Sequence, residues 1–203
     1  MAQTRRRNRR YKKKKTGRKR LVVLVVLVVV IVAGYFILTN NKTQKAIGNA
    51  FYPLKYSEYV DKAAEDYGVK KELIYAMIRT ESHFKKNAVS SAGAIGLMQL
   101  TPETYEWLCN KRDIEYVDDG LYKPSINIDF GTYLISYLFD EFGDEKLVIA
   151  AYNAGPDNVK KWLKDPEYSS DGKTLDNIPY SETEKHVDKV LDAEKKYKKL
   201  YFS

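Results

Sequence analysis

Glu81 is the residue of this sequence best placed to donate a proton in catalysis. It ends the segment KKELIYAMIRTE, in which Leu73, Ile74, Met77 and Ile78 recur at the spacing of one buried helix face. Glu81 follows Met77 by four residues, so a helix that continues this far places its carboxyl group on the same apolar face. Burial disfavours the charged form of a carboxyl group, and a general acid must carry its proton near neutral pH. The pattern therefore predicts acid catalysis by Glu81.

Three segments of the chain carry a resemblance to a known family. They are ESHFKKNAVSSAGAIGLMQLTP at 81–102, AYNAG at 151–155 and IPYSET at 178–183. In content and order they resemble the signatures of the soluble lytic transglycosylase (SLT) family, whose catalytic domain is similar to goose-type lysozyme. The resemblance covers roughly Tyr56 to Val190. It implies a predominantly α, lysozyme-like single domain.

The resemblance also implies a reaction on peptidoglycan. Glycosidases usually employ two carboxyl groups, whereas SLT enzymes use a single glutamate, which matches Glu81. This residue would protonate the oxygen between N-acetylmuramic acid and N-acetylglucosamine, and its carboxylate would then accept the proton of the muramoyl 6-hydroxyl. Attack of that hydroxyl on C1 gives a 1,6-anhydro end, and the exclusion of water favours this ring closure over hydrolysis. The resemblance implies no metal and no cofactor.

Substrate-binding residues are implied near this glutamate. Ser82 would steady the Glu81 carboxylate through its hydroxyl, and Gly96 would let the backbone approach the sugar closely. Gln99 would contact an N-acetyl or hydroxyl group of the sugar. Met98 shares this segment, although a methionine there is more often part of the core.

The two downstream segments supply further candidates. Tyr152 matches the family's active-site tyrosine, whereas Asn153 is expected to hold the turn through its amide. Glu182 matches the glutamate of the third segment and is expected in the cleft, although it could serve only as an acidic residue in the first turn of a helix.

The sequence departs from the family pattern at two positions. Lys86 stands where proline is usual, and His186 stands where a tyrosine is common. We expect Lys86 to affect the stiffness of the loop and His186 to affect one substrate contact. Neither side chain is expected to reach the Glu81 carboxylate.

The sequence leaves three functions open. The first is a membrane-anchored lytic transglycosylase, and the second is a muramidase that hydrolyses the same bond with water. The third is a non-catalytic wall-binding module of a secretion or conjugation apparatus. The presence of Glu81 argues against the third function.

The N-terminus combines a basic tail with a long apolar run. Residues 1–20 hold 12 of the 35 Lys and Arg residues, so the rest of the chain has 23 basic against 27 acidic residues, a net charge of −4. Leu21 to Leu38 follows without a charged residue, which is close to the ~20 residues that cross a bilayer as a helix. We therefore interpret the basic run as a cytoplasmic tail rather than a nucleic-acid-binding segment.

The apolar run is longer than the core of a cleavable signal peptide, which spans ~7–15 residues. We predict an uncleaved single-pass helix that contacts the bilayer, with the N-terminus in the cytoplasm and the chain from Thr39 outside. Residues 39–55 are predicted to form a linker and residues 56–203 the catalytic domain. The single cysteine, Cys109, excludes an internal disulfide and is expected to be buried.

Helices must position these residues, because few segments alternate with period two. We predict a helix after Ser57 as N-cap that stops at Gly68, and another that begins at Thr101. A further helix is predicted over NIDFGTYLISYLFDEFG and ends on Gly143, and others are predicted over KLVIAAYN and DNVKKWL. A last helix is predicted from Ser181, with a capping box formed by Ser181 and Glu184.

Overall fold

The computed structural model describes residues 2–40 and 48–203, and the side chains of residues 2–18 and 38 fall outside that description. Residues 41–47 of the predicted linker therefore lie outside the described residues. The chain divides into two compact units, Met1–Phe51 and Tyr52–Ser203.

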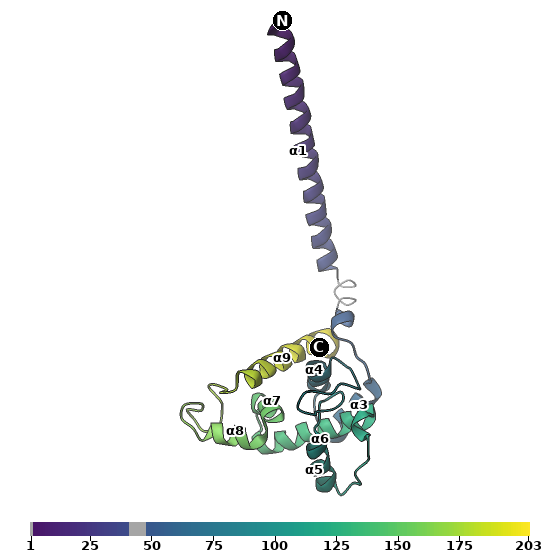
Figure 1. Ribbon diagram of the computed structural model, residues 1–203, viewed down its shortest axis with the longest axis vertical. Coiled ribbons are helices and arrows are strands. Elements are labelled where there is room, and N and C mark those ends of the chain that lie inside the picture. Colours follow the sequence, from purple (N-terminus) through teal and green to yellow (C-terminus); the bar gives the residue numbers. More distant parts are fainter. Residues whose placement is uncertain (1, 41–47) are drawn as a thin grey trace. The chain divides into compact units, whose positions relative to one another are not determined.

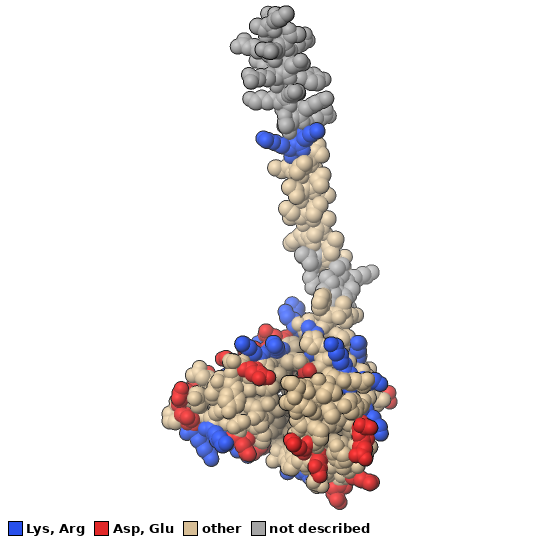
Figure 2. All heavy atoms as spheres, in the orientation of Figure 1, with Lys and Arg blue, Asp and Glu red and all other residues tan. Residues whose placement is uncertain are grey.

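The first unit contains one long helix, α1 (Ala2–Thr39). Its stretch Lys19–Ile37 is long and apolar enough to cross a membrane, and none of that stretch is buried within the structure. Figure 2 shows this stretch as a band without charged atoms beyond Lys19 and Arg20. The predicted boundary between the tail and the apolar run thus falls inside one continuous helix.

The second unit is built from helices (Figure 1). In chain order these are α3 (Ser57–Tyr67), α4 (Lys71–Ser82), α5 (Pro102–Arg112), the 3-10 helix η1 (Gly120–Tyr122), α6 (Pro124–Phe142), α7 (Glu145–Ala154), α8 (Pro156–Leu163), α9 (Ser181–Tyr197) and the π-helical η2 (Lys198–Phe202). Over the described residues there is no strand, only isolated bridges that join Val89 to Ile95 and Ile95 to Leu100. The predicted α class is confirmed.

Several helix ends follow the predicted signals. Thr101 caps α5, because its hydroxyl oxygen accepts a hydrogen bond from the Thr104 amide at 3.1 Å. Gly68 and Gly143 end α3 and α6 in the left-handed conformation that glycine adopts without strain.

Two predicted caps are wrong. Ser57 already lies inside α3, whose N-cap is Tyr56, and Ser181 lies inside α9, whose N-cap is Tyr180; neither cap makes a side-chain hydrogen bond. Both helices begin one residue early, so each serine adopts helical backbone and leaves the capping position to a tyrosine.

The core of this unit surrounds α4. The predicted apolar face is confirmed, since Leu73, Ile74, Met77 and Ile78 are at most 1% exposed. α9 packs against α4 and α7, and α6 packs against α3 and α7. Cys109 is buried as expected. The last residues of α4 thereby lie where three helices and the loop after α4 meet.

Candidate active site

Glu81 is the next-to-last residue of α4, and its side chain is 14% exposed. The helix ends at His83, which adopts the left-handed conformation with φ 51° and donates its backbone N–H to the Arg79 carbonyl. Glu81 therefore combines the rigidity of a buried helix with a position beside a loop. The expected burial of its carboxyl group is confirmed.

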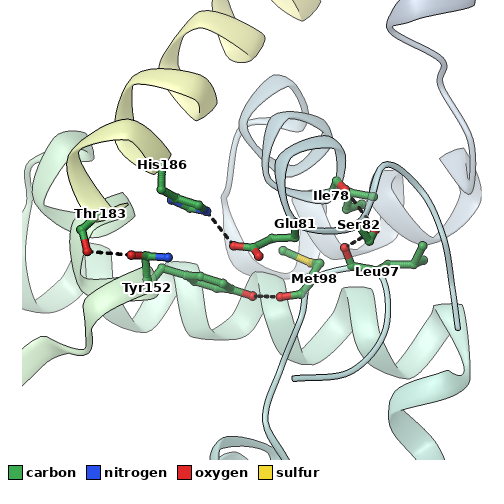
Figure 3. A network of polar contacts seen from close by, with 9 residues as sticks. Ile78, Glu81, Ser82, Leu97, Met98, Tyr152, Thr183 and His186 are labelled. Carbon is green, nitrogen blue, oxygen red and sulfur yellow. Dashed lines mark hydrogen bonds and ion pairs between the residues drawn. The ribbon is translucent and has the colours of Figure 1, made fainter. Parts of the chain in front are cut away.

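His186 contacts the Glu81 carboxylate directly, and the expectation that it would not is wrong. Its Nε2 lies 2.8 Å from Oε1 of Glu81, within hydrogen-bond distance (Figure 3). The His186 side chain is 11% exposed, and its Nδ1 is buried with no hydrogen-bond partner among the described residues. The packing of α9 across α4 brings together two residues that are 105 positions apart in the sequence.

Tyr152 lies on the α7 side of the site. Its hydroxyl donates a hydrogen bond to the Met98 carbonyl at 2.8 Å (Figure 3). Burial, together with the negative charge of Glu81, raises the pKa of the Tyr152 phenol well above its ordinary value of 10. Tyr152 therefore remains a neutral donor at physiological pH and ties α7 to the loop that follows Glu81.

Asn127 holds the same loop from the side of α6, and sequence reasoning missed it. Its side chain is fully buried; its Oδ1 accepts from the Met98 amide at 2.7 Å, and its Nδ2 donates to the Ile95 and Leu121 carbonyls at 2.9 Å each. A buried polar side chain whose hydrogen bonds are satisfied makes the surrounding structure more rigid, so Asn127 holds this loop against α6. Only its position among apolar residues of a helix could have indicated this role.

Gly96 is buried and packs closely against Asn127 and Leu121, and its approach to a sugar stays a prediction. Its φ is +84°, and an added Cβ would come within 2.2 Å of Asn127 Nδ2 and 2.4 Å of the Leu121 carbonyl oxygen. A side chain at position 96 would therefore displace Asn127. Close packing therefore requires glycine at position 96, whereas a Cβ at Gly93 would meet nothing within 4 Å.

Ser82 does not steady the carboxylate as expected. Its hydroxyl points to backbone carbonyls, 2.8 Å from Leu97 and 3.1 Å from Ile78 (Figure 3). The residue is buried and joins the end of α4 to the loop. Its effect on Glu81 is thus exerted through the backbone.

Two other loop candidates differ in exposure. Gln99 is half-buried and adopts a left-handed backbone with φ 50°, while its Nε2 donates to the Gly96 carbonyl at 2.9 Å and the Ala88 carbonyl at 3.3 Å. Met98 is fully buried, as expected of a core residue, and its side chain packs against Gly131.

The start of α9 carries the remaining candidates. Glu182 is exposed, and the next residue, Thr183, is buried and donates its hydroxyl to Oδ1 of Asn153 at 2.7 Å. This bond joins Asn153, which lies inside α7, to α9, and the expected role of its amide in the turn after α7 stays a prediction. The same bond also fixes α9 one turn before His186.

A pocket of about 340 Å³ has Tyr152 in its wall. The other contributors include Trp107 of α5 and Tyr137 of α6, whose rings meet edge to face with centroids 5.3 Å apart. Trp107 is 41% exposed. Exposed aromatic rings of this kind offer apolar faces to a ligand while their polar edges stay in water.

Comparison with protein families matches residues 58–174 to the transglycosylase SLT domain. The chain belongs to the transglycosylase SLT domain family. The match includes Glu81 and Tyr152 and ends before the IPYSET segment and His186. The family resemblance drawn from the sequence is confirmed.

Known members of the family share about a third of the aligned residues with this SLT domain. The soluble lytic murein transglycosylase of Salmonella typhimurium is 32% identical over 151 residues, or 72% of this chain and 23% of that protein. The membrane-bound lytic murein transglycosylase C of Haemophilus ducreyi is 37% identical over 124 residues, which cover 53% of this chain and 32% of that protein. The chain thus spans about a quarter to a third of the length of these relatives.

Solved structures confirm the lysozyme-like fold. An inactive glutamate-to-glutamine mutant of the lytic transglycosylase Slt from Pseudomonas aeruginosa superposes with a TM-score of 0.65 at 33% identity, over 73% of this chain and 25% of that one. The 70-kDa soluble lytic transglycosylase of Escherichia coli gives a TM-score of 0.66 at 25% identity, over 80% and 31% of the two chains.

Proposed function

We propose that this protein is a peptidoglycan lytic transglycosylase anchored to the cell membrane by its N-terminal helix. The observation that best supports the proposal is one glutamate, Glu81, held largely out of water at the end of α4, with an imidazole as its hydrogen-bonding partner. This differs from glycosidases that hydrolyse with two carboxyl groups, in which the second carboxyl group lies about 5 to 9.5 Å from the first, on the opposite side of the scissile bond. The partner of Glu81 is the His186 imidazole. The names of the relatives supply the substrate class, murein.

In the proposed reaction, Glu81 gives its proton to the glycosidic oxygen as the bond to C1 of N-acetylmuramic acid breaks. The carboxylate then removes the proton of the muramoyl 6-hydroxyl, whose oxygen forms the new bond to C1. The proton given up is recovered, and the product carries a 1,6-anhydro end. The half-buried position of Tyr152 and the low exposure of Glu81 support a site from which bound glycan excludes water.

Analysis of the products tests this proposal. The full-length protein in detergent is incubated with purified sacculi, and the released muropeptides are examined by mass spectrometry. We expect 1,6-anhydro ends from the wild type, whereas reducing ends would assign a hydrolase. Binding without release would assign a non-catalytic module.

Replacement of the acid tests the role of Glu81. We expect Glu81→Gln to retain sacculus binding and to lose at least about a hundredfold in cleavage rate, the usual contribution of a general acid. Glu184→Gln is a matched control, because Glu184 is exposed on α9. Release of muropeptides by Glu81→Gln at the wild-type rate would refute the assignment.

A further inference from the structure

We propose that the lysine-rich end of the second unit is a docking surface for anionic lipid, which gives the enzyme a membrane contact besides α1. The surface is formed by the lysines at the end of α9 and in η2: Lys195, Lys196, Lys198 and Lys199. This inference rests on the proposed membrane anchor, because the anchor brings the surface to the bilayer.

The charge of the second unit is unevenly distributed. Of the 23 basic residues after position 20, Lys42 and Lys45 precede this unit, so residues 52–203 hold 21 basic against 27 acidic residues, a net charge of −6. Residues 195–203 nevertheless contain four lysines and no acidic residue. In Figure 2, Lys and Arg atoms are prominent at the end of the unit where Figure 1 marks the C-terminus, and Asp and Glu atoms gather at the opposite end. An acidic unit thus carries a concentrated positive charge at one end.

The four lysines are available to an external anion. All four are exposed, whereas Tyr197 between them is fully buried and packs into the core. Within the described part of the chain none of the four makes an ion pair. The carboxyl groups of Glu145 and Glu194 pair with Lys70 instead. The positive charge of this surface is therefore not neutralised by ion pairs within the unit.

Apolar side chains lie among these lysines. Leu200, Tyr201 and Phe202 are half-buried, and the Phe202 ring stacks on Tyr75 with the centroids 6.2 Å apart. Lysine and tyrosine combine an apolar body with a polar tip, and tyrosine is enriched where proteins meet the lipid headgroups. The surface therefore has the composition of a membrane-interface segment.

The chain from the proposed anchor enters the second unit at this same end. The Tyr201 hydroxyl donates to the carbonyl of Tyr52, the first residue of the unit, at 2.8 Å. Twelve residues lie between Thr39, the last residue of α1, and Tyr52, so covalent geometry limits their span to about 45 Å. A short tether raises the effective concentration of the surface at the bilayer, and the attraction of lysines to anionic lipid then acts over about a Debye length.

One helix joins this surface to the active site. His186 of α9 contacts Glu81, and Lys198 follows His186 by twelve residues, which is about 18 Å along a helix. Docking on lipid therefore holds the active site at a short, set reach from the bilayer. Glycan strands that lie close to the membrane are then the accessible substrate.

Fluorescence quenching in proteoliposomes tests the contact. Full-length Ser203→Cys is labelled with a fluorophore, because Ser203 is exposed and Cys109 is buried. The labelled protein is reconstituted with a trace of lipid that carries a nitroxide quencher on its headgroup. We expect quenching to be at least about twofold stronger in equimolar phosphatidylcholine and phosphatidylglycerol than in phosphatidylcholine alone, and this difference should disappear at about 0.5 M NaCl, which screens the charges.

Removal of the four charges supplies the matched comparison. We expect the difference between the two vesicles to be lost when all four lysines are replaced: Lys195→Gln, Lys196→Gln, Lys198→Gln and Lys199→Gln. The control makes the same change of charge at four exposed lysines of other segments that also form no ion pair with a described residue: Lys123→Gln, Lys161→Gln, Lys164→Gln and Lys173→Gln. This control should keep the difference. Equal quenching in the two vesicles before any lysine is replaced, or an undiminished difference in the first variant, would overturn the proposal.

Two further outcomes separate this contact from the anchor and from another anionic partner. Protein that floats with neither vesicle in a density gradient would refute the proposed anchor, whereas an anchored protein with equal quenching would overturn only the lipid contact. Lysine-dependent binding of soluble polyphosphate in detergent, without stronger quenching in the anionic vesicles, would assign the surface to a phosphate-containing wall polymer and overturn lipid docking.

Discussion

At the scale of single residues, the site depends on a few side chains that hold the loop after Glu81 against the helices. Tyr152 donates to the Met98 carbonyl, and Asn127 accepts from the Met98 amide. The backbone N–H and the backbone carbonyl of Met98 are thereby both bound by side chains, one from α6 and one from α7. The position of this loop beside Glu81 thus depends on long-range contacts.

Asn127→Ala should be among the most destabilising single substitutions in the domain. It leaves the Met98 amide and the Leu121 carbonyl without a partner, whereas the Ile95 carbonyl still accepts from the Leu100 amide at 3.2 Å. Each buried group that loses its only partner costs about 1–3 kcal/mol. We expect a fall of at least about 3 kcal/mol in the free energy of unfolding, measured by urea denaturation.

Asn127→Asp is the matched control for this substitution. It keeps the acceptor for Met98 and loses the two donor bonds, so it also places a carboxylate against two carbonyl oxygens. We expect it to be at least as destabilising as Asn127→Ala. Wild-type stability in both variants would show that Asn127 does not support the loop.

The sequence placed Glu81, the proposed acid, on a buried helix face but did not predict its partner. Glu81 could be placed because its neighbours within one helix define its face. The contact with His186 spans 105 residues and that of Asn127 with Met98 spans 29, so both depend on how helices pack rather than on local pattern. Ser82 follows Glu81 in the sequence, and we expected its hydroxyl to contact that carboxylate. The hydroxyl instead donates to the Leu97 carbonyl, a contact that the local sequence does not reveal.

At the scale of elements, α9 is fixed against α7 at both ends. Near its start, Thr183 bonds to Asn153, and near its end Glu194 meets Glu145 of α7 with Lys70 beside them. Burial and a hydrogen bond to Glu145 raise the pKa of Glu194 to about 7. The two carboxyl groups thus share a proton below neutral pH.

This pair makes stability depend on pH. Because the pKa of Glu194 is higher in the folded state than its ordinary value of 4.5, folding binds the proton more tightly, and this contribution is lost as pH rises through about 7. Glu194→Gln keeps a donor for Glu145 without the charge. We expect it to be more stable than the wild type above pH 7 by on the order of 1 kcal/mol, since water screens part of the pair.

Thermal unfolding between pH 4 and pH 9 measures this effect. The two proteins should converge at pH 4, where the wild-type carboxyl group is protonated in both the folded and the unfolded state. Curves that run parallel over the whole range would show that Glu194 does not hold the proton.

Helix type and extent were predicted better than helix starts. The apolar periodicity that predicts α4 is a property of many residues, whereas a cap depends on one backbone conformation. Tyr56 takes the left-handed conformation at φ 61° before α3, a choice that no local signal favours for tyrosine.

At the scale of the whole molecule, the proposed membrane anchor rests on the apolar part of α1. The predicted fold class is confirmed, but the proposed single-pass topology rests on length, composition and the basic tail. Both length and composition can be read from the local sequence, because a helix that crosses a bilayer needs about 20 consecutive apolar residues.

Cysteine labelling tests the topology. Cys109 is 1% exposed and should react little with a maleimide reagent. Labelling of an introduced cysteine can therefore be distinguished from labelling of Cys109. In spheroplasts we expect a membrane-impermeant maleimide to label Ser203→Cys, and to label Gln3→Cys only after the membrane is permeabilised. The reverse pattern, or release of the protein into the soluble fraction, would contradict the proposed anchor.

The two ends of the second unit meet. The Tyr201 hydroxyl donates to the Tyr52 carbonyl at 2.8 Å, and the Tyr197 hydroxyl donates to the Pro53 carbonyl at 3.3 Å. Because its two ends lie close together, this unit can be joined to another protein at a single position in that protein's chain. It is therefore suited to splicing into a surface turn of an unrelated carrier, or to circular permutation by a short bridge between its two ends.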